Sequence, residues 1–543
     1  MTQLGELFAQ GKVEEIWDRC CGFIDLSIED FMKIQERLLQ EQLELLKKCE
    51  LGKHIFNGAT PTNSEELRRS VPLTTYADYA PFLTKRRMDI LPKRPILWQY
   101  TSGKNGEYAH RWAPVTARQM DEVESLVWAM ALFSSCNKRK DINIRPNDAV
   151  LYGMAPPPYA TGTIARCFPH EKFNFLPKVE EAERIPFEDR VKKGFQMALS
   201  EGLDYCLSMS SVTVALGNRF SQSSSKISMK FLLSNPKAML RLLKGKIKAK
   251  LAGRPMLPKD LWKVKGLMTY GIDGSVYREK IKEQWGRYPL DFHGCTEAFL
   301  IATQTWDYSS MTFVPYMQFF EFIPEEEAVK SWRDTSYQPK TLLMDELKPG
   351  NYEVVITSFH GGPFVRYRLG HLVQITSLRN EALDIDIPQM IYLTRVDDQI
   401  DIAGFTRLSE KGIWQAIENS RVEYVDWVAC KERVNNTPRL HLYIEPKDNT
   451  TQTKEEVTAS IHEELKKVHP GYADLESFIG LMPLDVTFLP KGAFKLYKIR
   501  QQNAGADLSD LKPPHLNPSA GDLAFMLNTP TKVTVKQEEA VKV

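Results

Sequence analysis

The chain has 543 residues, 43% of them hydrophobic and 26% charged, with a formal net charge of +2. This length allows more than one domain, and the composition is that of an ordinary globular protein. Because the net charge is so small, no global field favours nucleic acid as a partner. No run approaches the roughly 18 apolar residues of a membrane span. The N-terminus lacks the basic start and apolar core of a secretory signal, so we expect a cytoplasmic protein.

The first predicted elements lead to a loop rich in hydroxyls and glycine. The helical spacing of Phe31, Leu38 and Leu46 predicts a helix over 28–50, capped by Asp25 or Ser27. The apolar run from Ile96 to Tyr100 has strand length. The loop that follows consists of Thr101, Ser102, Gly103, Lys104, Asn105 and Gly106. Glycine amides at a strand end can bind phosphate, although an ordinary Ser/Gly turn is the alternative.

The middle of the chain alternates strands with loops and helices. A strand running into a Pro- and Gly-rich loop is predicted over 147–165, and a polar loop over 221–228. The segment from Lys230 to Lys265 is basic, with Lys244, Lys246, Lys248, Lys250, Arg254, Lys259 and Lys263 inside it. It could attract a membrane surface or a polyanion. The preferred interpretation is an amphipathic helix that docks on the core through Leu240, Leu243, Ile247 and Leu251 and leaves the lysines in solvent.

Two further segments carry polar groups at strand ends. The first is His293-Gly294-Cys295-Thr296-Glu297, whose carboxylate suits Mg²⁺, with a plain polar turn as the alternative. In the second, Arg366 and Arg368 flank Tyr367, so both guanidinium groups would point to one face of a strand. They suit phosphate or carboxylate ligands, and a cross-strand ion pair on a solvated face is the alternative. Strands are predicted over 352–357 and 372–376.

The pattern changes at Arg395. A turn at Asp397, a helix near 410–418, strands near 424–430 and 440–445, and a helix near 453–467 predict a small α+β unit. Few large apolar residues follow Leu527, so 521–543 is expected to be a disordered tail. The eight cysteines form no C-x-x-C pair and are expected to be free thiols.

The ordered set of segments resembles the adenylate-forming superfamily of acyl-CoA synthetases, luciferases and peptide synthetase adenylation domains. It is more similar to the Gretchen Hagen family of auxin-responsive acyl-acid amido synthetases. The stretches that carry this resemblance are 51–83, TSGKNGEYAHRWAPVT (101–116), FVPYMQFFEFIPEEE (313–327), YEVVITSFHGGPFVRYRLGH (352–371) and KPPHL (512–516). The resemblance implies an α/β fold with a large multi-layer adenylate-forming domain over 1–395, its first 60 residues helical, and a smaller α+β domain over 396–520.

The resemblance also implies roles for individual residues. Thr101, Ser102, Gly103 and Gly106 would wrap the phosphates of ATP, with Lys104, Asn105 and Cys295 beside them. Thr296 would contact the α-phosphate and Glu297 the Mg²⁺ ion. The nucleotide site would also include Tyr367, Arg368, His371 and the hinge residue Asp397. Lys512, or else Lys498, would reach the adenylation site. His371 stands where the family has a ribose-binding aspartate, and Lys104 or Asn105 where it has a third hydroxyl.

The implied function is that of an ATP- and Mg²⁺-dependent ligase. A carboxylic acid would be activated as acyl-AMP and its acyl group passed to an amino acid amine. The alternatives are a CoA ligase on the same fold and a catalytically inactive relative that acts as a binding module. The acid would be apolar or aromatic if Phe299, Trp306, Tyr308, Phe313 and the stretch 205–216 line its pocket. We expect a monomer without nucleic-acid partners.

Overall fold

Apolar residues at helical spacing build the N-terminal part of the chain. In the computed structural model, helix α3 (Ile28–Lys47) buries Phe31, Leu39 and Leu46, and Ser27 caps it by accepting a hydrogen bond from the amide of Asp30. The prediction over 28–50 is therefore confirmed, with Ser27 rather than Asp25 as the cap. The structure describes residues 3–100, 111–154, 156–167, 172–185, 187–223, 233–270, 274–334, 336–396, 399–402, 406–434, 437–447, 450–475, 483–503 and 515–529.

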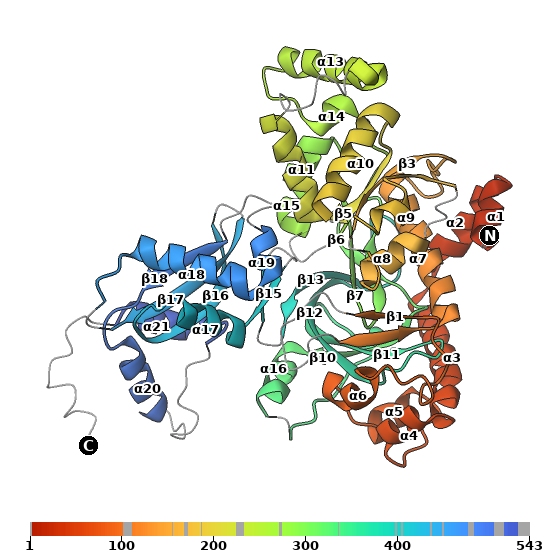
Figure 1. Ribbon diagram of the computed structural model, residues 1–543. Coiled ribbons are helices and arrows are strands. Elements are labelled where there is room, and N and C mark those ends of the chain that lie inside the picture. Colours follow the sequence, from red (N-terminus) through yellow and green to blue (C-terminus); the bar gives the residue numbers. More distant parts are fainter. Residues whose placement is uncertain are drawn as a thin grey trace. The chain divides into compact units, whose positions relative to one another are not determined.

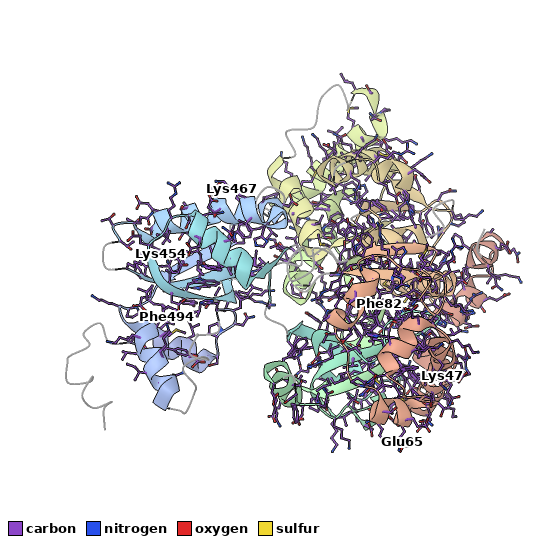
Figure 2. All side chains as sticks on the ribbon, turned by 60° about the horizontal axis from the view of Figure 1, so that its bottom comes forward. Lys47, Glu65, Phe82, Lys454, Lys467 and Phe494 are labelled. Atoms are coloured by element: carbon purple, nitrogen blue, oxygen red, sulfur yellow. The ribbon has the colours of Figure 1, made fainter. Side chains whose placement is uncertain are left out.

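The described residues form two compact units, one up to Val396 and one from Gln399 onward. In the first unit, α3 is accompanied by the short helices α1 (Gln3–Ala9), α2 (Val13–Cys21), η1 (Gly22–Asp25), α4 (Glu50–Phe56), α5 (Ser64–Ser70) and α6 (Tyr76–Leu83). Figure 2 labels Lys47 at the end of α3, Glu65 in the first turn of α5 and Phe82 in α6. These helices pack with the central sheet into one continuous hydrophobic core.

A mixed sheet of eleven strands organises the first unit, in the order β10-β11-β12-β13-β9-β8-β7-β6-β5-β3-β4 (Figure 1). The half from β4 to β7 is parallel and the half from β7 to β10 is antiparallel. The strands are β3 (Ala149–Gly153), β4 (Asn174–Leu176), β5 (Tyr205–Met209), β6 (Gly266–Tyr270), β7 (Leu290–Cys295), β8 (Phe299–Gln304), β9 (Met311–Phe313), β10 (Gln318–Pro324), β11 (Gly350–Ser358), β12 (Tyr367–Ser377) and β13 (Gln389–Arg395). The predicted strands 352–357 and 372–376 are confirmed as parts of β11 and β12.

Helices of this unit pack against the sheet and against one another. They are α7 (Ala117–Ser135), α8 (Ala160–Cys167), α9 (Val179–Ala182), α10 (Phe187–Glu201), α11 (Ser210–Ser223), α13 (Pro236–Leu251), α14 (Pro258–Leu261), α15 (Gly274–Trp285), α16 (Glu325–Arg333) and η2 (Met344–Glu346). A separate antiparallel ribbon joins β1 (Leu97–Tyr100) to β2 (Trp112–Val115). The predicted strand at 96–100 is thus confirmed. The prediction of a loop up to residue 165 is wrong from residue 160 onward, because helix α8 begins there.

The second unit has its own hydrophobic core around Trp427 and Ile444. It contains β14 (Gln399–Ile402), β15 (Thr406–Ser409), α17 (Glu410–Asn419), β16 (Tyr424–Val434), β17 (Thr437–Pro446), α18 (Lys454–Val468), α19 (Pro470–Asp474), β18 (Leu484–Phe488), α20 (Ala493–Asn503) and α21 (Ala520–Leu527). Figure 2 labels Lys454 and Lys467 near the two ends of α18, and Phe494 in α20. Helix α21 contradicts the structureless tail expected from residue 521, and its Met526 is fully buried.

Candidate functional site

A tight hairpin positions the motif from His293 to Glu297. Strand β7 ends at Cys295, the chain turns through Thr296 and Glu297, and β8 begins at Phe299. At Gly294 an added Cβ would lie 1.9 Å from the carbonyl oxygen of Phe299, so only glycine fits there. The turn leaves Cys295, Thr296 and Glu297 half-buried. The motif is therefore the polar tip between two core strands.

The strand that leads into the predicted phosphate loop ends against this turn. The side-chain amide of Gln99 donates to the carbonyl of Thr296 at 2.7 Å. The hydroxyl of Thr296 donates to the carbonyl of Tyr100 at 3.4 Å. Tyr100 is the last described residue before the loop. Thr101, Ser102, Gly103, Lys104, Asn105 and Gly106 lie outside the described residues.

A buried tyrosine holds Glu297 from the other side. The Tyr367 hydroxyl donates to Oε1 of Glu297 at 3.3 Å. The Tyr367 ring is 1% exposed and packs on Phe364 and Tyr79, with centroids 4.6 and 5.8 Å apart. Since the ring is fixed by this packing, the carboxylate of Glu297 is oriented by a rigid donor. The structure thus brings together Thr296, Glu297 and Tyr367 of the residues predicted from the sequence.

The two arginines that flank Tyr367 are engaged in ion pairs. Arg368 donates from Nε to Glu353 at 3.1 Å, and its guanidinium lies 4.4 Å from the ring centroid of Trp332. Arg366 donates to Glu321 at 2.8 Å. Both carboxylates are fully buried. The cross-strand ion pair therefore holds for Arg368, which pairs with β11, while Arg366 lies just before β12 and pairs with Glu321 of β10; both pairs are buried instead of solvated.

His371 lies inside the sheet, on β12. Its Nδ1 is 3.0 Å from Nε2 of His293 on β7, and Tyr392 of β13 stacks on His293 with centroids 4.6 Å apart. Burial lowers the pKa of His293 to about 3, so this ring is neutral at pH 7. His371 is only 4% exposed. The imidazole thus has a partner within the sheet at the position where the family resemblance expects a ribose ligand.

The remaining predicted residues lie in the second unit, in the core of the first, or outside the described ranges. Asp397 and Lys512 lie outside the described residues. Lys498 is exposed on α20 of the second unit. Of the predicted pocket aromatics, Phe313 packs on Phe320 and Phe322. Tyr308 donates to the carbonyl of Ser134 at 3.1 Å, and Trp306 packs near Trp17 and Phe133. Core packing accounts for these contacts.

Sequence reasoning missed the partners of the predicted residues. Gln99, Glu353 and His293 each contact a predicted residue directly. Glu353 had a usable signal, because a lone acidic residue within an apolar strand run needs a buried partner. Nothing local in the sequence pairs His293 with His371, which is 78 residues away.

Within the described residues, no group of three or more His, Cys, Asp or Glu side chains could hold a metal ion. No helix in the described ranges is both long enough and apolar enough to cross a membrane. The eight cysteines are free thiols, as predicted. Within the described turn, Glu297 is the acidic side chain that could face a metal ion, and a Mg²⁺ ion there would take further oxygen ligands, such as those of a nucleotide or water.

Three family models match the chain in succession. They are the GH3 family N-terminal domain over residues 20–147, the central domain over 311–390 and the C-terminal domain over 410–520. The jasmonoyl–L-amino acid synthetase GH3.5 of Oryza sativa subsp. japonica is 26% identical over 49% of this chain and 47% of its own length. The indole-3-acetic acid-amido synthetase GH3.3 of Arabidopsis thaliana is 26% identical over 38% and 34%. The chain thus spans about half the length, or less, of these curated relatives.

Solved structures resemble this one over most of the chain. The acyl acid amido synthetase AtGH3.15 in complex with 2,4-DB has 16% identity and a TM-score of 0.50, over 93% of this chain and 95% of that one. A 2-hydroxyisobutyryl-CoA ligase in complex with 2-HIB-AMP and CoA has 13% identity and a TM-score of 0.53, over 85% and 87%. These likenesses establish the fold and confirm the predicted fold class.

Proposed function

Since the chain belongs to the GH3 family, we propose that it is an ATP-dependent ligase that joins a carboxylic acid to an amino acid through an acyl adenylate. The amido synthetases among its relatives support the amide product. One observation carries the proposal. The Glu297 carboxylate, held by Tyr367, lies in the same turn as Thr296, which bonds to the strand leading into Thr101–Gly106.

The first step forms the adenylate. A carboxylate oxygen of the acid attacks the α-phosphorus of ATP, the bond to the β-phosphate oxygen breaks, and pyrophosphate leaves. The Thr296 hydroxyl is proposed to exchange its long bond to the Tyr100 carbonyl for a bond to an α-phosphate oxygen, and the loop from Thr101 to Gly106 to bind the other phosphates. Glu297 would hold Mg²⁺, which would neutralise charge on the phosphate oxygens.

The second step transfers the acyl group. The neutral amine nitrogen attacks the acyl carbon, the bond from that carbon to the phosphate oxygen breaks, and AMP leaves with the bonding electrons. The nitrogen releases one proton to solvent. We propose that 1–395 form the adenylating domain and that 396–520, joined at Asp397, supply Lys512 or Lys498 to it. Arg368 is proposed to act through the sheet, by holding the start of β12, because Glu353 already binds its guanidinium. We further propose that the enzyme acts as a cytoplasmic monomer.

Product analysis tests this function. The purified chain is incubated with ATP, Mg²⁺ and a panel of apolar, aromatic and hydroxy acids, and pyrophosphate release is followed. An amino acid mixture or CoA is then added, and the molecular masses of the products are determined by mass spectrometry. We expect acid-dependent pyrophosphate release and an amide product. A thioester alone would make the protein a CoA ligase, and no pyrophosphate release together with no ATP binding would make it an inactive relative.

A further inference from the structure

Helix α13 is apolar on two opposite faces. Its buried residues are Ala238, Leu242, Gly245 and Ala249. Four large aliphatic side chains point the other way, with exposed fractions of 54% for Leu240, 50% for Leu243, 59% for Ile247 and 83% for Leu251. We call these four residues the outer stripe. The prediction that the outer stripe packs on the core is therefore wrong. The opposite, buried face of α13 packs on the core instead.

The inner face fixes the helix firmly. A Cβ on Gly245 would lie 2.6 Å from Leu261 and 2.9 Å from Met256, so the helix approaches its neighbours as closely as glycine allows. Arg241 donates to the carbonyl of Ala198, in α10, at 3.1 Å. Figure 1 shows α13 at the outer edge of the first unit, beyond α14 and α11. The outer stripe therefore faces away from the core, on a helix whose other face is packed on the first unit.

Lysines border the outer stripe on both sides. At 100° per residue, Lys244 and Lys248 fall on one flank and Lys246 and Lys250 on the other. All four lysines are exposed. No acidic residue occurs between Asp204 and Asp260, and Asp260 is bound by Arg254 at 2.8 Å. The face is therefore an apolar stripe between two positive rows.

We propose that α13 docks the protein on an anionic lipid surface. The outer stripe would enter the boundary between headgroups and acyl chains, and the lysines would extend their stems along it to reach lipid phosphates. The phosphates of a nucleic acid could pair with the lysines. The aliphatic side chains of the outer stripe, which lie between the lysines, would then face charged phosphate. A second copy of the chain would cover the stripe but would bring two sets of lysines together. Of these three, an anionic lipid layer complements both features of the face.

Vesicle sedimentation tests the proposal with the full chain. Vesicles of phosphatidylcholine, with and without about 30% phosphatidylglycerol, are compared. The stripe variant is Leu240→Ser/Leu243→Ser/Ile247→Ser and the lysine variant is Lys244→Gln/Lys246→Gln/Lys248→Gln/Lys250→Gln. The control Met88→Ser/Leu378→Ser changes apolar residues outside α13 that are similarly exposed, at 45% and 47%. Circular dichroism melting monitors folding of all four proteins.

We expect binding to anionic vesicles that weakens at high salt. It should fall at least ~10-fold in the stripe variant. It should fall ~100-fold or more in the lysine variant, because each lysine at an anionic surface is worth a factor of about five. The control should bind like the unmodified chain. Binding that neither variant weakens, or no binding at all, would overturn the proposal. A dimer in vesicle-free sedimentation that only the stripe variant dissociates, without vesicle binding, would assign the face to self-association instead.

Discussion

The imidazoles of His371 and His293 are joined inside the sheet by one hydrogen bond of 3.0 Å. His371 is 4% exposed, so a carboxylate at this position would be buried and would lose the bond to His293. The pair therefore favours a site rebuilt around imidazole over a weakened ribose clamp.

Replacing His371 with aspartate should not tighten ATP binding. We expect His371→Asp to lower the free energy of unfolding by about 1–3 kcal/mol, because it removes the bond to His293 and buries an acidic group. Calorimetric titration with ATP and urea unfolding measure both effects, with His371→Asn as the uncharged control. A tenfold or greater gain in ATP affinity for the aspartate variant would restore the ribose-clamp interpretation.

His293 should make the first unit sensitive to acid. Burial lowers its pKa from 6.5 to about 3, so between these values the unfolded chain binds a proton that the folded chain does not. The resulting stability is complete above pH 6.5 and is lost as the pH falls toward 3. His293→Gln removes this titration. The stability advantage of the unmodified chain over the variant should shrink by about 1.4 kcal/mol per pH unit from pH 6 to 4. Urea unfolding at several pH values checks this, and parallel curves would contradict it.

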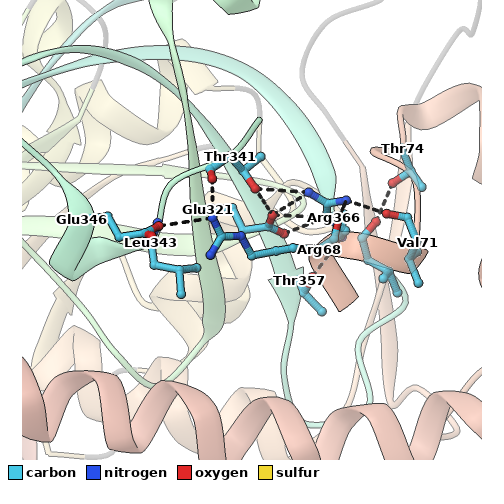
Figure 3. A network of polar contacts seen from close by, with 10 residues as sticks. Arg68, Val71, Thr74, Glu321, Thr341, Leu343, Glu346, Thr357 and Arg366 are labelled. Atoms are coloured by element: carbon cyan, nitrogen blue, oxygen red, sulfur yellow. Dashed lines mark hydrogen bonds and ion pairs between the residues drawn. The ribbon is translucent and has the colours of Figure 1, made fainter. Parts of the chain in front are cut away.

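Two buried arginines fasten the start of β12, one to β11 and one to β10. Figure 3 shows Arg366 between Glu321 of β10 and the carbonyl of Val71, which follows α5. Thr341 donates to the same carboxylate at 2.6 Å. One guanidinium thus joins the sheet to the N-terminal helices. The Arg366 guanidinium and the Glu321 carboxylate neutralise each other. Removing only one of these two side chains would therefore leave the other as an unpaired buried charge.

Breaking the pair from one side should destabilise the first unit strongly. We expect Arg366→Met to cost about 3–5 kcal/mol of unfolding free energy, and the double variant Arg366→Met/Glu321→Gln to cost less than the single one. The control is Arg37→Met on α3, whose partner Glu41 lies in solvent and whose loss should change little. Urea unfolding of these proteins, together with the single variant Glu321→Gln that completes the cycle, gives the coupling energy. Equal losses for Arg366→Met and Arg37→Met would contradict the account.

Element periodicity explains which parts of the structure could be predicted. Helix α3 and strands β11 and β12 followed from apolar spacing, because large side chains on one face mark the core side. The rule predicted the wrong core-facing side for helix α13, because mostly small residues of this helix face the core and its large aliphatic residues face outward. Within the site, the Thr296–Glu297 turn followed from glycine and strand patterns. The contact between His293 and His371 did not, because pairing of distant strands has no local signal.

At the scale of the whole molecule, each unit has a separate core. The first is built around the sheet, and the second around Trp427, whose ring stacks on His515 with centroids 4.4 Å apart. Separate cores in one chain favour separate unfolding transitions.

Truncating Trp427 should therefore affect one transition only. We expect Trp427→Ala to cost the second unit about 3–5 kcal/mol and to leave the transition of the first unit in place. Trp128→Ala, at an equally buried position of the first unit, should do the reverse. Differential scanning calorimetry of both variants measures the shifts. A single transition that moves equally in the two variants would mean that the cores unfold together.

We propose above that the Thr296–Glu297 turn belongs to an adenylating site, and the substitution Glu297→Gln is the sharpest test of this role. The variant keeps the shape of the side chain but removes the carboxylate proposed to hold Mg²⁺. We predict that acid-dependent pyrophosphate release falls by at least ~10²-fold while the melting temperature is preserved. The control Glu326→Gln, on an exposed position of α16, should keep full activity. Unchanged pyrophosphate release by the folded Glu297→Gln variant would contradict the claim.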